Sequence, residues 1–141
     1  MSTPTENITS VLLETVLVLD NDVLVRMPIC EYLRDCGYRV LEAANADEAK
    51  AILEKRDIKI DVLLSDIQMP GHMNGFAFVA WARSMRPGLV IVIAGTPERA
   101  ANAAGELCEH GPILGRPYEP QTVLQRIKRL LAARSAELAR E

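Results

Sequence analysis

Asp20, Asn21 and Asp66 each stand directly after an apolar run of strand length. Asp66 follows the run Val62–Ser65, and Asp20 with Asn21 follows the run Val16–Leu19. Such runs are typical of parallel strands buried on both faces, and open α/β sheets bind their ligands at the carboxyl ends of the strands. If the two strands are neighbours, the three side chains meet at one edge. Their oxygens suit a hard divalent cation such as Mg²⁺, beside which Asp66 could accept a phosphoryl group.

A cationic side chain is expected to complete this site. A carboxylate repels an incoming phosphoryl group unless positive charge neutralises the oxygens. Arg116 follows another apolar run, Ile113–Gly115, and precedes Pro117. If that run is a strand of the same sheet, Arg116 lies at the same edge as Asp66 and contacts the phosphoryl group.

The rest of the chain alternates strand-like and helix-like patterns. The expected strands are Val16–Leu19, Tyr38–Ala43, Ile60–Ser65, Leu89–Gly95 and Ile113–Gly115. Helix starts are indicated by Asp22, interpreted as a cap, and by the capping box of Asn45 and Glu48. This alternation predicts a doubly wound, flavodoxin-like α/β fold: a five-stranded parallel sheet with five helices on both faces, joined by right-handed crossovers.

Length and hydropathy predict a single domain. The chain has 141 residues, of which 49% are hydrophobic, enough for one core and little more. Residues 1–14 are expected to form a tail and residues 15–133 the domain. A helix opening at Pro120 carries an apolar stripe further than one small domain covers, so residues 134–141 are expected to form a helical extension.

Charge and cysteine usage exclude several classes of protein. A net charge of −3 offers no electrostatic footprint for nucleic acid. The first basic residue is Arg26 and the apolar runs are too short for a membrane span, which predicts a cytoplasmic protein without a signal peptide. Cys30, Cys36 and Cys108 have no CxxC spacing and fall in predicted helices, which favours buried thiols over a disulfide or a zinc site.

Three segments in order carry a resemblance to a known family. They are Val16–Asp22, Asp66–Gly75 and Gly115–Pro120, and together they resemble the receiver domain of response regulators in bacterial two-component signalling. The resemblance implies a phosphoprotein of a phosphorelay rather than an enzyme. It also implies that Asp66 takes a phosphoryl group from a phosphohistidine on a sensor histidine kinase or phosphotransfer protein. In that family Mg²⁺ is held by the positions of Asp20, Asn21, Asp66 and the backbone carbonyl of Gln68.

The chain departs from the family pattern at four positions. Asn21 stands where a second acidic residue is usual, so it offers an oxygen without a charge. Ala94 stands where a Ser or Thr hydroxyl is usual, and Thr96 is a weak candidate to replace it. Arg116 replaces a Lys, and Ile113 replaces a large aromatic residue, which puts the coupling between phosphate and surface in question.

Two alternatives remain open from the residues. The chain could be a degenerate receiver that binds partners without phosphorylation, which Asn21 and Ala94 favour. It could also be a small haloacid-dehalogenase-like phosphohydrolase, in which Asp20 is the nucleophile and Asp22 the general acid. The short chain and the lack of a late acidic pair argue against the second alternative.

A partner surface is expected on the Pro97–Ala133 face. Its small alanines and long leucine stripe are expected to leave apolar area that a downstream protein or a second copy of the chain covers.

Overall fold

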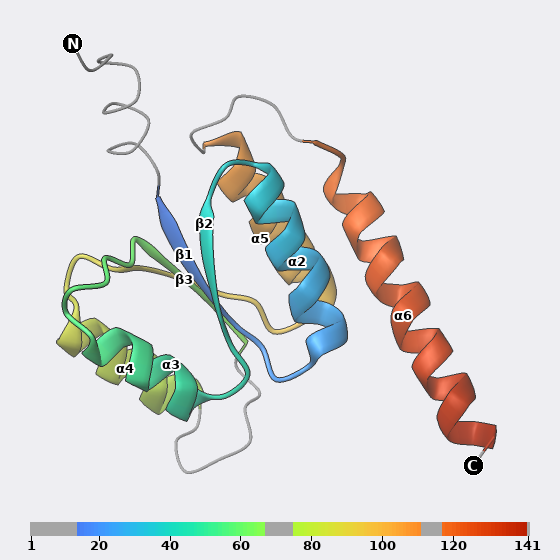
Figure 1. Ribbon diagram of the computed structural model, residues 1–141, viewed down its shortest axis with the longest axis horizontal. Helices are drawn as coiled ribbons and strands as arrows, with labels where there is room; N and C mark the ends of the chain where they lie inside the picture. Colours follow the sequence, from blue (N-terminus) through green and yellow to red (C-terminus); the bar gives the residue numbers. More distant parts are fainter. Residues whose placement is uncertain (1–13, 67–74, 111–116, 141) are drawn as a thin grey trace.

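The computed structural model describes residues 14–66, 75–110 and 117–140. Within them, one parallel sheet has the order β2-β1-β3-β4 (Figure 1). Its strands are β1 (Thr15–Leu19), β2 (Arg39–Ala43), β3 (Val62–Ser65) and β4 (Val90–Ile93). The doubly wound parallel class is confirmed with four strands, and the fifth predicted strand, Ile113–Gly115, lies outside the described residues.

Five helices are described: α2 (Val23–Asp35), α3 (Ala46–Glu54), α4 (Gly75–Met85), α5 (Pro97–Glu109) and α6 (Pro120–Arg140). The predicted caps are confirmed. The Asp22 carboxylate accepts a hydrogen bond from the backbone N–H of Leu24 at 3.0 Å. Asn45 Oδ1 accepts one from Glu48 N–H at 2.8 Å, while Glu48 Oε1 accepts one from Ala44 N–H at 2.9 Å. Each cap satisfies a donor that the first helical turn leaves unpaired.

The α2 helix contains a proline and stops at a glycine, as the sequence indicates. Pro28 lies inside the helix and is buried. Gly37 has a φ of 99°, a left-handed conformation that glycine adopts without steric cost. This conformation turns the chain directly from α2 into β2.

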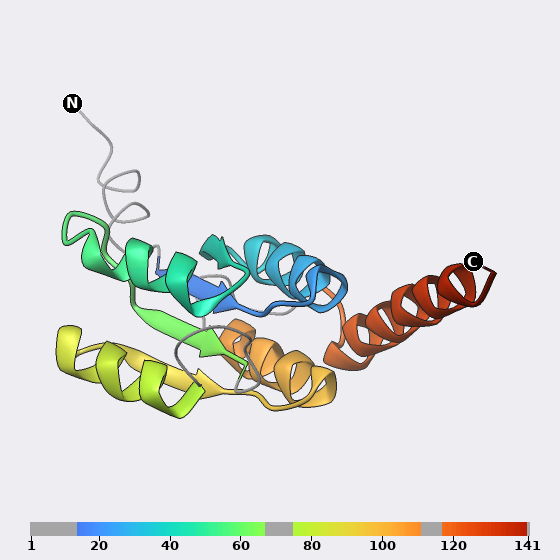
Figure 2. The same cartoon turned by 90° about the horizontal axis from the view of Figure 1, so that it is seen from below.

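The helices form two layers around the sheet. One core cluster joins Val16 and Val18 of β1 to α2, α5 and α6, and a second joins Leu17 and Leu19 to α3 and α4. Alternate residues of a strand point to opposite faces, so these clusters define an α2 face and an α3 face of the sheet. Figure 2 shows the two groups of helices on either side of the sheet.

The α5 helix is tied to α2 by a disulfide. Cys36 at the end of α2 is bonded to Cys108 in the last turn of α5, with their Cα atoms 5.5 Å apart, while Cys30 is a free buried thiol. The expectation of three thiols is therefore wrong for two of them. The cysteines lie in or beside helices, as predicted, but no local pattern indicated which face of the sheet α5 covers. The two bonded cysteines are also 72 residues apart in sequence.

Part of the expected partner face is buried inside the protein. Ala100, Ala103 and Ala104 of α5 are buried within the chain, so the argument that they leave apolar area for a partner is wrong. Burial of Leu124 and Ile127 anchors the first half of α6, whereas residues 132–139 are exposed. Figure 1 shows that half extending beyond the other helices.

None of the helices in the described ranges is long and apolar enough to cross a membrane.

Candidate functional site

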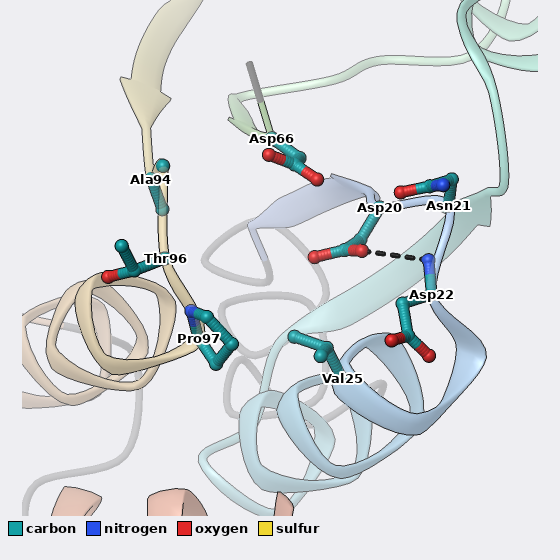
Figure 3. A pocket seen from close by; sticks show the side chains of 9 residues that line it. Asp20, Asn21, Asp22, Val25, Asp66, Ala94, Thr96 and Pro97 are labelled. Carbon is teal, nitrogen blue, oxygen red and sulfur yellow. Dashed lines mark hydrogen bonds between the residues drawn. The ribbon is translucent and has the colours of Figure 1, made fainter. Parts of the chain in front are cut away.

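A pocket of about 250 Å³ opens at the carboxyl edge of the sheet. It is lined by Asp20, Asn21, Asp22, Val25, Asp66, Ala94, Gly95, Thr96 and Pro97 (Figure 3). The structure thus brings together three of the predicted site residues, Asp20, Asn21 and Asp66. Their roles as metal ligands and phosphoryl acceptor remain predictions.

The parallel register places the two main carboxylates. Leu19 pairs with Ser65, so Asp20 and Asp66 each follow the last residue of adjacent strands. The Asp66 N–H donates to the Leu19 carbonyl at 2.9 Å, and the Asp20 N–H donates to the Ala43 carbonyl at 3.1 Å. These bonds fix both backbones at the sheet edge, because each residue continues the ladder by one hydrogen bond.

The side chain and carbonyl of Asp20 are held from the first turn of α2. Its Oδ1 accepts a hydrogen bond from the backbone N–H of Asp22 at 2.9 Å, drawn in Figure 3. Arg26 Nη1 donates to the Asp20 backbone carbonyl at 2.6 Å, and its Nε lies 3.1 Å from Glu42 Oε1. Sequence reasoning missed Arg26, because one arginine inside a helix carries no local signal that it faces a strand end.

The pocket is electronegative. Burial, with the neighbouring carboxylates of Asp66 and Asp22, raises the pKa of Asp20 to about 6, although the Asp22 N–H and Arg26 oppose the shift. A desolvated carboxylate near like charges disfavours its own ionised form, and a bound cation would reverse this. The site therefore favours a positive ion.

The donor set fits Mg²⁺. In the described residues no three His, Cys, Asp or Glu side chains are grouped as a metal site. Mg²⁺ does not require such a group, because it keeps several waters and commonly binds through one or two carboxylates. Asp20, Asp66 and the Asn21 amide oxygen supply that set at the pocket (Figure 3).

The opposite wall of the pocket carries little polar chemistry. Ala94 follows β4, is 6% exposed, and donates its N–H to the Ser65 carbonyl at 2.9 Å. Thr96 caps α5, where its Oγ1 accepts a hydrogen bond from Arg99 N–H at 3.1 Å. A capping role thus explains Thr96 without any contact to a phosphoryl group.

Two predicted contributors lie outside the described residues: Gln68, whose backbone carbonyl was expected to bind the metal, and Arg116, expected to contact phosphate. Ile113 lies there as well.

The domain is an open, doubly wound α/β fold with an acidic pocket at the carboxyl ends of its strands, which is where such folds bind their ligands. Residues 16–128 match the family model of the response regulator receiver domain. The chain belongs to that family, as its three motifs indicated. Receiver domains are signalling modules of two-component systems and typically bind Mg²⁺ at the phosphorylation site.

Two of the curated relatives are named as transcriptional regulatory proteins. The transcriptional regulatory protein AruR of Pseudomonas aeruginosa is 29% identical over 119 residues, covering 82% of this chain and 48% of that protein. ResD of Bacillus subtilis is 28% identical over 116 residues, covering 82% of this chain and 47% of that protein. The chain spans about half the length of these relatives.

Solved structures share the fold. The chemotaxis response regulator CheY4 of Vibrio cholerae has a TM-score of 0.55 at 30% identity, covering 83% of this chain and 98% of that one. A CheY-like receiver domain protein of Methanospirillum hungatei has a TM-score of 0.56 at 26% identity, covering 89% and 98%. These likenesses favour a receiver over a phosphohydrolase.

Proposed function

We propose that this chain is a response regulator receiver that accepts a phosphoryl group on Asp66 from a phosphohistidine of a sensor histidine kinase or phosphotransfer protein. The observation that carries the proposal is the shared pocket of Asp20, Asn21 and Asp66 at the carboxyl edge of β1 and β3. The family match and the electronegative pocket support it.

The chemistry requires a carboxylate nucleophile and charge neutralisation. An Asp66 oxygen attacks phosphorus, a P–O bond forms, and the P–N bond to the donor imidazole breaks as that imidazole leaves. Mg²⁺, when bound, would neutralise charge on the phosphoryl oxygens. Asp20 and Asn21 hold ligand oxygens toward the pocket, and the Asp22 N–H keeps the Asp20 carboxylate in place.

Arg116 is proposed to supply the cationic contact to the phosphoryl group. Among the described residues, Arg26 contacts a predicted metal ligand, but its guanidinium already donates to the Asp20 carbonyl and pairs with Glu42. A second source of positive charge is therefore required.

Asn21 and Ala94 support a second candidate, a receiver that acts through binding without phosphorylation. Asn21 brings no charge to the pocket, and Ala94 brings no hydroxyl to its wall. Both features weaken metal binding and phosphate contact relative to the family pattern.

We further propose that the protein acts in the cytoplasm through a downstream protein partner, with no nucleic-acid or membrane surface and no enzymatic turnover of its own. The second half of α6 is exposed at residues 132–139. It takes in the end of the Pro97–Ala133 face and the helical extension beyond it, and it is the surface proposed to bind a partner or a second copy.

Labelling with a small phosphodonor and Mg²⁺ tests the two candidates. Wild type is expected to gain one phosphoryl group, and Asp66→Asn none. Ser65→Ala is a matched control, since it alters the neighbouring side chain and leaves the carboxylate. Absence of labelling at every Mg²⁺ concentration favours the phosphorylation-independent receiver.

A further inference from the structure

Arg26 is a charged side chain held largely inside the protein beside the pocket. Its side chain is 14% exposed, and its guanidinium stays positively charged at physiological pH. Removing such a charge from water costs free energy unless fixed partners compensate it. Arg26 has two partners: the backbone carbonyl of Asp20, at the end of β1, and the carboxylate of Glu42, on β2. The guanidinium therefore links the site to the neighbouring strand.

Three hydrogen bonds converge on Asp20. Its N–H donates to the Ala43 carbonyl at 3.1 Å, and its Oδ1 accepts from the Asp22 N–H at 2.9 Å. Its carbonyl accepts from Arg26 Nη1 at 2.6 Å. The first two bonds join Asp20 to backbone groups of other residues, whereas the third comes from a side chain. A substitution of Arg26 therefore removes one of these bonds and leaves the partners of the other two in the chain.

The bond from Arg26 orients the peptide plane between two proposed metal ligands. The Asp20 carbonyl oxygen belongs to the planar peptide unit that ends at the Cα atom of Asn21. Holding this oxygen therefore fixes the direction in which Asn21 leaves Asp20. Figure 3 shows one Asp20 carboxylate oxygen on the Asp22 N–H and the other directed into the pocket that Asn21 also lines. Mg²⁺ demands near-ideal octahedral geometry, so its binding is sensitive to the placement of both side chains.

Glu42 orients Arg26 and balances its charge. One Glu42 carboxylate oxygen lies 3.1 Å from Arg26 Nε, and the other lies 3.2 Å from Arg34 Nη2. An uncompensated guanidinium this close to the pocket would repel a divalent cation. The pair of Arg26 and Glu42 carries no net charge, and the charge of Arg34, whose side chain is 46% exposed, is screened by solvent. Arg26 can therefore hold the Asp20 carbonyl without opposing a cation in the pocket.

We propose that Arg26 is a positioning residue of the site: its guanidinium, oriented by Glu42, fixes the peptide plane between Asp20 and Asn21, so that both side chains hold oxygens for a divalent cation. Arg26 touches neither the ion nor the phosphoryl group and acts through Asp20. The inference rests on the proposed function, because this ion is the one that phosphoryl transfer to Asp66 needs.

Amide hydrogen exchange of the full chain without metal tests the positioning directly. The Asp22 N–H is the reporter, because it donates to Asp20 Oδ1. Arg26→Met keeps an unbranched side chain and removes the donors, and we expect the Asp22 amide to exchange at least about tenfold faster in it. The Leu24 amide, which donates to the Asp22 cap, should keep its wild-type rate, which separates this effect from fraying of α2.

Arg34→Met is the matched control. Arg34 shares Glu42 with Arg26, but its guanidinium donates to the Val40 carbonyl rather than to Asp20. The variant removes a cation from the same carboxylate and leaves the bond to Asp20 intact. We expect both amides to exchange at the wild-type rate in it.

Isothermal titration with Mg²⁺ forms the second arm. Arg26→Met is expected to weaken binding by about tenfold or more, the usual cost of losing a residue that orients a metal ligand. Arg26→Lys should fall between the two proteins, because an ammonium keeps the charge but not the fork that reaches both partners. Glu42→Gln should also weaken binding, because the charge of Arg26 is then uncompensated. Arg34→Met should stay within about twofold of wild type.

The sign of the change in Arg26→Met decides between the alternatives. Tighter Mg²⁺ binding would mean that the arginine opposes the cation, and equal binding would mean that it only packs. Either result, an unchanged Asp22 exchange rate, or an equal loss of binding in Arg34→Met overturns the assignment. The expected losses of Mg²⁺ affinity in a protein whose Asp66 never labels support the positioning role and contradict the proposed function instead.

Discussion

Asp20 and Asp66 leave adjacent strands one residue after the paired positions Leu19 and Ser65, and their carboxylates share one pocket. Burial and the neighbouring carboxylates raise the pKa of Asp20 to about 6 from its ordinary value of 3.8. Between about pH 4 and about pH 6, the folded state therefore binds more protons than the unfolded state. The free energy of unfolding accordingly falls as pH rises through this range, because the Asp20 carboxyl must ionise at a buried position.

Asp20→Asn is therefore expected to stabilise the metal-free protein at pH 7. Two pKa units correspond to about 3 kcal/mol, and solvent screening of this partly exposed group reduces the expected gain to about 1–2 kcal/mol. The gain should shrink as pH falls through this range and vanish well below pH 3.8, where Asp20 is protonated in both states. Urea unfolding of both proteins at several pH values measures it. A destabilised variant at pH 7, or a gain that does not change with pH, would contradict the account.

Asn21→Asp is expected to tighten Mg²⁺ binding by about tenfold or more. A unit charge about 4 Å from another is worth about 4 kcal/mol at an effective dielectric of 20, before desolvation and per charge of the ion. Even a heavily discounted gain should lower the Mg²⁺ concentration needed for labelling of Asp66. Isothermal titration with Mg²⁺ gives the affinity directly. Unchanged or weaker binding in the variant would show that Asn21 is not a ligand.

Asp22 is expected to act as a helix cap rather than as a general acid. Its carboxylate accepts from Leu24 N–H at 3.0 Å and lies 3.5 Å from Arg134 Nη1. Asp22→Ala should cost about 1 kcal/mol of stability, while Asp22→Asn keeps most of the cap. Arg134→Ala should cost less than about 1 kcal/mol, because the ion pair is exposed. Thermal unfolding compares the three variants.

Phosphodonor labelling of Asp66 distinguishes a helix-capping role of Asp22 from a role as the general acid of a phosphohydrolase. Asp22→Asn should label at Asp66 at a rate close to wild type. A phosphohydrolase that used Asp22 as its acid would lose turnover of a phosphate ester in this variant.

Arg86 is expected to be among the most stabilising surface side chains. Its guanidinium donates to the carbonyls of Leu53 at 3.1 and 3.0 Å, Ile58 at 2.8 Å and Lys55 at 2.8 Å, so it closes the end of α3 from the end of α4. Arg86→Ala should cost about 2–3 kcal/mol, since charged donors to otherwise unpaired carbonyls are lost. The exposed Arg83 is a matched control, and equal effects of the two alanine variants in urea unfolding would refute this role.

The sequence was sufficient for most elements and for the pocket, because both follow from local patterns. Apolar runs that end on Asp20 and Asp66 reveal buried parallel strands and their carboxyl edge together. Caps such as Asp22 and Asn45 mark helix starts through side-chain chemistry that acts within three residues. Contacts between distant segments were not predictable in this way. Neither the bond between Cys36 and Cys108 nor the reach of Arg86 to α3 leaves a local trace.

The face of the sheet that α5 covers could not be predicted from local patterns either. Its small alanines were expected to leave apolar area for a partner, but a shallow face fits either side of a parallel sheet, and the structure places the helix against α2. The argument that Ala100 and Ala103 leave apolar area for a partner was wrong for that reason, because both are buried. The partner surface itself stays a prediction.

The most direct measurement for the central claim is the intact mass of the protein after incubation with a small phosphodonor and Mg²⁺. Wild type, Asp66→Asn and Asp20→Asn are compared across a Mg²⁺ titration, with hydrolysis of a generic phosphate ester followed in parallel. The account predicts one added phosphoryl group in wild type, none in Asp66→Asn, a higher Mg²⁺ requirement in Asp20→Asn, and no ester turnover. Labelling that persists in Asp66→Asn, or ester turnover that is abolished only by Asp20→Asn, would contradict it.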